Sequence, residues 1–227
     1  MNNRLKYVPI LLVGVLVLSI AAAPAHARRN GPPAGVSGSL ASSGFNCSEC
    51  HVGSTGFAGS VQILGAPSYY QQSAIYDLTV RIADASQAGA GFQMSVEDDE
   101  GNHVGSLIVT DATNTQLNSE DSGYINHTGA GVNNSVTNWD SLGDAAEYTV
   151  RWQAPSSVVG PITFWAAGNA INNDFSFFDD HVYVTSVTAG VPVPAVSEWG
   201  LMVLGLLLTT AATLIAARRS RRAVWHD

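Results

Sequence analysis

Apolar residues follow two patterns along this chain of 227 residues, and each pattern predicts a different kind of element. Two nearly unbroken apolar runs lie towards the ends, from Val8 to Ala23 and from Leu201 to Ala217. Between them, apolar and polar positions alternate with a period of two, which is typical of half-buried strands. The pattern therefore predicts an all-β body between two apolar terminal segments.

The strand pattern is clearest at Ile75–Ile82 and again at Gly91–Val96. Residues 98–102 form a polar turn, so we interpret His103–Thr110 as the returning strand of a hairpin with Gly91–Val96. Short strands separated by turn residues, with no convincing amphipathic helix between them, predict an antiparallel β-sandwich. The further strands that we expect are Tyr148–Gln153, Ile162–Ala167 and His181–Val187.

The first apolar run is typical of a secretory signal peptide. Arg4 and Lys6 precede it, and Ala25-His26-Ala27 then matches the small-x-small pattern that signal peptidase reads. We expect residues 1–27 to be removed and the mature protein to begin near Arg28. A retained membrane anchor is the alternative, but the run is short and ends in a cleavage pattern.

The second apolar run indicates one transmembrane helix, residues 201–217. A basic tail, residues 218–227, follows it and marks the cytoplasmic side, so the body faces away from the cytoplasm. A buried core helix is the alternative, but a charge-free run that ends in four arginines argues against it. These membrane-stop residues are Arg218, Arg219, Arg221 and Arg222.

The residues before this span resemble the IPTL-type C-terminal sorting signals of Gram-negative bacteria, which are similar to the PEP-type signals that exosortases handle. Val193, Ala195 and Val196 depart from the Ile-Pro-Thr-Leu opening of that family. The resemblance implies that residues 191–200 are a linker and sorting motif, and that an exosortase-type enzyme cuts near it and passes the body to the cell surface. The matching residues are Pro194, Ser197, Glu198, Trp199 and Gly200.

The body is strongly acidic. From Asn30 to Gly190 its basic residues are Arg81 and Arg151, against sixteen carboxylates, which gives a net charge of −14. Such a surface makes nucleic acid and anionic lipid poor partners. It suits solubility outside the cell, and it would also attract a basic redox partner protein, although solvation is the commoner reason for such acidity.

One short motif carries candidate chemistry. Cys47, Cys50 and His51 form a C-x-x-C-H string, which is the attachment site of c-type haem: two thiols bond the porphyrin and the histidine ligates the iron as the proximal ligand. The string lies in residues 28–60, which are rich in Gly, Pro and Ser and favour irregular chain over a cytochrome-like helix. The alternative is a Cys47–Cys50 disulfide, or two free thiols, beside an unrelated histidine.

The body, residues 61–190, also resembles the bacterial reeler-like domains, of which one subgroup is called choice-of-anchor. The resemblance spans most of residues 45–187, includes the C-x-x-C-H string, and implies an immunoglobulin-like β-sandwich with no established activity. It is carried by Gly91-Phe92-Gln93, His127-Thr128, Trp152-Gln153-Ala154-Pro155, Ile162–Ala170 and Asp180-His181-Val182-Tyr183.

A haem would need a sixth iron ligand or water. His127 is the first candidate, because it lies in a predicted Gly- and Asn-rich loop and matches the resembled His-Thr; a histidine bonded to backbone is the equally favoured alternative. His103 is expected in solvent, His181 at a strand start, and Met94 in the core. The acidic clusters fit solvated turns better than calcium loops. No catalytic constellation appears, so we do not expect an enzyme.

These observations predict an exported, membrane- or surface-anchored protein whose β-sandwich carries one haem c for electron transfer or redox sensing. Its expected partners are the cytoplasmic membrane, the processing enzyme and a redox protein. The alternative is a structural or adhesive surface module with a Cys47–Cys50 disulfide and no metal at His51.

Overall fold

The computed structural model describes residues 28–52, 57–191 and 198–223. It divides into two compact units, Met1–Val191 and Pro192–Asp227, which we describe separately. The predicted signal peptide lies outside the described residues, as do Pro194 and Ser197 of the predicted sorting motif.

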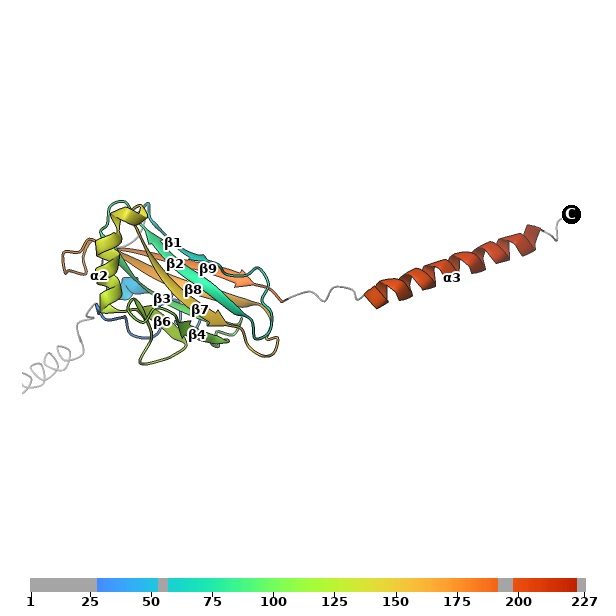
Figure 1. Ribbon diagram of the computed structural model, residues 1–227, viewed down its shortest axis with the longest axis horizontal. Coiled ribbons are helices and arrows are strands. Elements are labelled where there is room, and N and C mark those ends of the chain that lie inside the picture. Colours follow the sequence, from blue (N-terminus) through green and yellow to red (C-terminus); the bar gives the residue numbers. More distant parts are fainter. Residues whose placement is uncertain (1–27, 53–56, 192–197, 224–227) are drawn as a thin grey trace, which may run out of the picture. The chain divides into compact units, whose positions relative to one another are not determined.

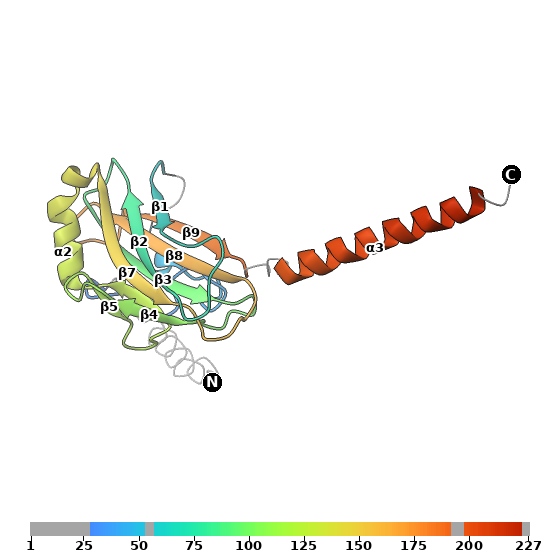
Figure 2. The same ribbon diagram turned by 45° about the vertical axis from the view of Figure 1, so that its right-hand side comes forward.

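The first unit is a sandwich of two sheets in which every strand pair is antiparallel (Figures 1 and 2). The predicted all-β, immunoglobulin-like fold class is confirmed. One sheet has the order β1-β2-β7-β4, with strands Ser60–Leu64, Ile75–Ala83, Ala145–Gln153 and Ser106–Val109. The other has the order β5-β6-β3-β8-β9, with strands Thr115–Leu117, Tyr124–His127, Gly89–Glu97, Ile162–Ile171 and His181–Ala189.

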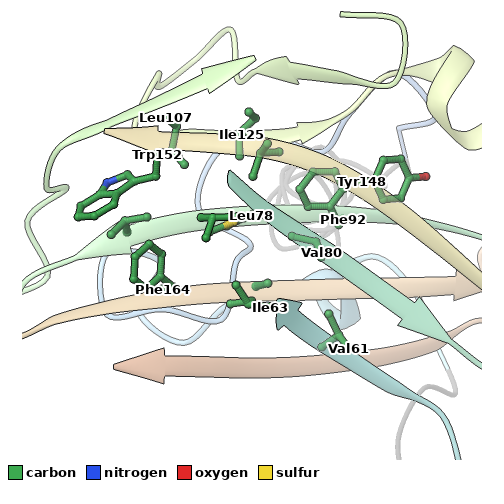
Figure 3. Close-up of a cluster of buried hydrophobic side chains, with 14 of the residues drawn as sticks. Val61, Ile63, Leu78, Val80, Phe92, Leu107, Ile125, Tyr148, Trp152 and Phe164 are labelled. Atoms are coloured by element: carbon green, nitrogen blue, oxygen red, sulfur yellow. The ribbon is translucent and has the colours of Figure 1, made fainter. Parts of the chain in front are cut away.

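The core lies between the sheets, where the alternating apolar positions of facing strands meet (Figure 3). Trp152 of β7 is fully buried; its ring meets that of Phe164 of β8 edge to face at 5.1 Å between centroids. Phe92 of β3 packs against Tyr148 of β7 at 4.7 Å. Aromatic pairs at such separations add to the stabilisation from burial, so these contacts hold the two sheets together.

The strand β3 departs from the expected alternation, because all nine of its residues are buried. Its inner face carries Phe92 and Met94, as the pattern predicts. Its outer face carries Gln93, Ser95 and Glu97, which are polar and yet fully buried. Buried polar groups require partners, and here the chain N-terminal to β1 supplies them by lying across this face.

The predicted hairpin of Gly91–Val96 with His103–Thr110 is wrong. The turn at residues 98–102 does form, and a single bridge joins Glu97 to His103. Gly105, at φ +71°, then redirects the chain, and β4 pairs with β7 in the opposite sheet. The carbonyl of Val104 accepts the Trp152 indole N–H at 2.8 Å, which satisfies the backbone where the chain crosses between the sheets.

The absence of a body helix was also predicted wrongly. Helix α2, Gly129–Asn138, lies at one end of the sandwich, where it contacts β3 and β7 (Figure 1). Its glycines and asparagines are poor helix formers. The Thr128 hydroxyl caps it by accepting the Gly131 N–H at 2.9 Å, and the buried Val132 and Ser135 attach it to the sheets.

The second unit contains helix α3, Glu198–Ala223. Its window Trp199–Ala216 has a mean hydropathy of 1.9 and is long and apolar enough to cross a membrane. At 1.5 Å per residue, the helix of 26 residues is about 39 Å long, which exceeds the hydrocarbon core. The hydroxyls of Thr209, Thr210 and Thr213 donate to carbonyls within the helix, so they present no unpaired donor to lipid.

Two positions on β2 test the sandwich. Replacing Leu78, 1 % exposed, by Ala is expected to lower the free energy of unfolding by about 2–5 kcal/mol, because it leaves a cavity between the sheets. The control Ile75→Ala, at a position 54 % exposed on the same strand, is expected to cost less than about 0.5 kcal/mol. Urea denaturation measures both, and equal losses would contradict the assigned core.

Candidate functional site

The C-x-x-C-H string begins with one short 3₁₀ helix, η2, Cys47–Glu49. The Asn46 side chain caps this turn by accepting the Ser48 N–H at 3.0 Å. The amides of Cys50 and His51 both donate to the Cys47 carbonyl, at 3.2 and 3.1 Å. The turn therefore has a defined conformation, with both cysteines partly buried.

The turn is attached to a segment far along the chain, the loop between β8 and β9. The Val52 amide donates to the carbonyl of Phe177 at 2.9 Å, and Val52 forms a parallel bridge with Phe178. These backbone bonds place the motif next to the end of β8 and the start of β9, where Asn169 and Asp180 lie.

His51 is held by a buried carboxylate. Its Nδ1 lies 2.6 Å from Oδ2 of Asp180, whose side chain is 1 % exposed. Oδ1 of the same carboxylate accepts the Asn172 amide at 3.2 Å. The Asn169 amide nitrogen lies 3.1 Å from Nδ1 and 3.3 Å from Nε2 of the imidazole. The side chains of Asp180 and Asn169 thus fix the orientation of the His51 ring.

The motif lines a cavity of about 200 Å³. Cys47, Cys50 and His51 form one wall, and His127 lies on the same cavity. It reaches the surface at Phe175, which is 86 % exposed and lies under the guanidinium of Arg29 at 5.5 Å. Apolar side chains supply much of the remaining lining: Pro32, Pro33, Val36, Val132 and Ile171.

His127 reaches this cavity from the end of β6, and the predicted loop position is wrong. Its ring occupies the space that Gly91 leaves: a Cβ at Gly91 would lie 2.6 Å from the His127 ring. Nδ1 lies 2.9 Å from the Phe92 amide nitrogen. Burial lowers the pKa of His127 to about 4, although hydrogen bonds to the backbone of Phe92 and Arg28 oppose the shift. The ring is therefore neutral at physiological pH.

The segment that covers the outer face of β3 also closes the cavity. Gln93 binds it at two points: its carbonyl oxygen accepts the Val36 amide at 2.7 Å, and its NH₂ donates to the Pro33 carbonyl at 2.8 Å. Gln116 and Asn118 donate to the carbonyls of Asn30 and Pro32. The segment has no neighbouring strand to pair with, so side-chain amides make the hydrogen bonds that its backbone needs.

The other sequence candidates lie elsewhere. Met94 is fully buried in the core, as expected. His103 is partly exposed and packs edge to face on Tyr124, outside the cavity lining. His181 begins β9, as expected, but it is buried, with its Nδ1 2.6 Å from Asp84. Burial alone would raise the pKa of Asp84, but hydrogen bonds from Tyr183, Ser86 and His181 lower it to about 2.

The two cysteines carry free thiols. Burial, together with the neighbouring Cys50, raises the pKa of the Cys47 thiol to about 12. Because the thiolate is the form that attacks disulfides and binds metal ions, Cys47 is a poor group for thiol exchange at neutral pH. Among the described residues, no three His, Cys, Asp or Glu side chains are arranged to hold a metal ion.

Asn169 and Asp180 are the site residues that the sequence did not reveal. Asp180 precedes His181 in the resembled Asp-His-Val-Tyr string, but only the fold brings it to His51, 129 positions away. Asn169 is 5 % exposed and lines the cavity, and its side-chain carbonyl oxygen has no hydrogen-bond partner among the described residues. A buried acceptor without a donor indicates space for a further group.

Comparison with known proteins identifies similar structures but no family. No family model matches the chain, and no curated protein matches it. The chain is similar to the Reelin-N domain of F-spondin, with 16 % identity, a TM-score of 0.44, and coverage of 65 % of this chain and 96 % of that chain. A human F-spondin reeler domain is similar at 17 % identity and a TM-score of 0.43, covering 62 % and 96 %.

The buried neutral His127 predicts a pH-dependent stability. Its pKa of about 4 in the folded state lies below the unfolded value near 6.5, so the unfolded chain binds the extra proton first. Stability is expected to fall as pH drops from 6.5 towards 4, by about 3 kcal/mol at most. His127→Gln should flatten this part of the stability curve. Equal curves for the wild type and His127→Gln would exclude the assignment.

Proposed function

We propose that the protein is an exported, membrane-anchored c-type haem protein that carries one porphyrin at the cavity of Cys47, Cys50 and His51. The observation that supports this most is the convergence of both thiols and the histidine on one largely apolar cavity. Electron transfer or redox sensing is the role that such a group would supply.

The residue types present fit covalent haem, and because the cavity of about 200 Å³ is smaller than usual ligand pockets, which are about 300–1,000 Å³, part of the porphyrin would lie outside it, at its opening beside Phe175. Each thiol would add its S–H across one vinyl group, which needs neither oxidant nor thiolate-bound metal, and both thiols are free. His51 would be the proximal ligand, with its Nδ1 bonded to Asp180 in the manner of metal-binding histidines. The apolar lining suits the porphyrin faces. Arg29, exposed at the cavity, suits a propionate, whereas Arg28, on the same cavity, is paired with Glu120 at 3.0 Å.

His127 is the candidate for a second iron ligand, because it shares the cavity with His51 and is neutral, as a ligand would have to be. Ligation would require one ring nitrogen to leave the backbone groups that now hold the imidazole. Asn169, with its unpartnered oxygen, is placed to bond a water or another group inside the cavity. The chain's own residues thus orient the group and limit the access of solvent.

The membrane anchor and the export route complete the proposal. Helix α3 is long and apolar enough to span a bilayer, and the positive-inside rule applied to the four arginines from Arg218 to Arg222 supports a cytoplasmic end for it. The body then lies outside, where a signal peptide would deliver it and where haem is attached. An exosortase-type enzyme would cut at the residues before α3, and the acidic surface would attract a basic redox partner.

Expression of the full chain with and without c-type maturation proteins tests the haem. With them, we expect a Soret band and an intact mass that exceeds the processed chain by one haem. Cys47→Ala, Cys50→Ala and His51→Ala should each weaken attachment or shift the spectrum. A colourless product two mass units lighter than the reduced chain would support the disulfide module instead.

Glu49→Gln is the matched control, because Glu49 is exposed and occupies one of the two variable positions of the motif. It should acquire haem as the wild type does. If haem is present, the absorption spectrum of His127→Ala tests the sixth ligand. An unchanged low-spin spectrum would remove His127 from that position.

A charge within α3 tests the anchor. Leu207→Arg lies inside the apolar window and is expected to disfavour insertion by about 2.5–3.5 kcal/mol. We expect the variant to move from the carbonate-washed membrane fraction towards the soluble fraction. The control Leu142→Arg, at an exposed position of the body, should stay in the membrane. Retention of Leu207→Arg in that fraction would count against a span at this helix.

A further inference from the structure

We propose that Asp180 is a positioning residue that fixes the His51 imidazole and lowers the reduction potential of the iron bound to it. The inference rests on the proposed haem function and deepens it. It is carried by the distance of 2.6 Å between Oδ2 of Asp180 and Nδ1 of His51 and by the nearly complete burial of the carboxylate.

The bond assigns separate roles to the two ring nitrogens. When Nδ1–H donates to the carboxylate, the tautomer is fixed and Nε2 is the nitrogen that would bind iron, after leaving the Asn169 amide nitrogen that now lies 3.3 Å from it. A carboxylate acceptor makes the imidazole a stronger electron donor than a carbonyl or water would, because it draws the Nδ1 proton towards itself. Greater donation stabilises the ferric state over the ferrous state, which lowers the potential.

The carboxylate is well placed to exert this effect. Its side chain is 1 % exposed, so solvent screens its negative charge weakly. Oδ1 is held by the Asn172 amide at 3.2 Å, and Asp180 immediately precedes β9, which pairs with β8. Backbone bonds from Val52 to the loop before β9 prevent the histidine from moving away from it. Contacts from the chain after the C-x-x-C-H string and from the segment before β9 therefore hold the pair in this geometry.

The chain contains a second aspartate–histidine pair that serves as an internal comparison. Nδ1 of His181 lies 2.6 Å from Asp84, the same distance as in the first pair. In the first pair His51 is 17 % exposed, whereas the side chains of His181 and Asp84 are both buried. This pair does not line the cavity. Asp84 also accepts hydrogen bonds from the Tyr183 hydroxyl and from Ser86. The two pairs thus match in the distance between Nδ1 and the carboxylate and in the burial of the aspartate, and only the first lines the cavity.

The experiment compares Asp180→Asn with Asp84→Asn in the full chain, purified in detergent after expression with c-type maturation proteins. Spectroelectrochemical titration measures the reduction potential, and intact mass confirms one haem. We expect a higher potential in Asp180→Asn and the wild-type value in Asp84→Asn. Thermal unfolding should show lower stability in both variants. A potential that changes only in Asp180→Asn is then not explained by the loss of stability.

An unchanged potential in Asp180→Asn, or the same rise in Asp84→Asn, would overturn the inference. If Asp180→Asn fails to acquire haem, Asp180→Glu takes its place, because it keeps the charge but moves it by one methylene. A smaller rise in potential is then expected, and the wild-type value would again overturn the inference. Failure of the proposed function gives a different result, since the wild-type protein itself would then lack a Soret band.

Discussion

The site depends on one constraint: the irregular segment before β1 lies on the outer face of β3, and its backbone polar groups must find partners there. Gln93 supplies both an acceptor and a donor to this segment. Ser95 and Glu97, two and four positions along the same face, bind Ser37 and the Ala41 amide. These buried side chains, together with the backbone bonds of Val52 to the loop before β9, define the position of the segment that carries the C-x-x-C-H string.

The strands were predictable because they alternate. Leu78, Val80 and Ile82 face the core at every second position of β2, as the pattern requires. The hairpin prediction failed because alternation does not determine which strand is the partner. A single glycine, Gly105, sends the chain to the other sheet, where Trp152 completes the crossing. Helix α2 escaped prediction because packing of Val132 and Ser135, rather than propensity, stabilises it.

The candidate site was predictable only in part. The spacing of Cys47, Cys50 and His51 is local and can be read directly, and His127 was found through a resemblance. Asp180 and Asn169 were not accessible, because each acts through a contact across more than a hundred residues. Asp180 is one of sixteen carboxylates in the body, and only its burial in the fold distinguishes it from the others.

The cavity is lined partly by residues near the start of the body's sequence and partly by residues near its end. The motif lies near residue 50, whereas Asn169, Phe175 and Asp180 are close to the last strand. A chain that crosses the membrane amino terminus first delivers its thiols long before that strand emerges. Under the proposed function, the machinery that attaches haem would therefore meet an open, accessible turn, and completion of β9 would close the site around the cofactor afterwards.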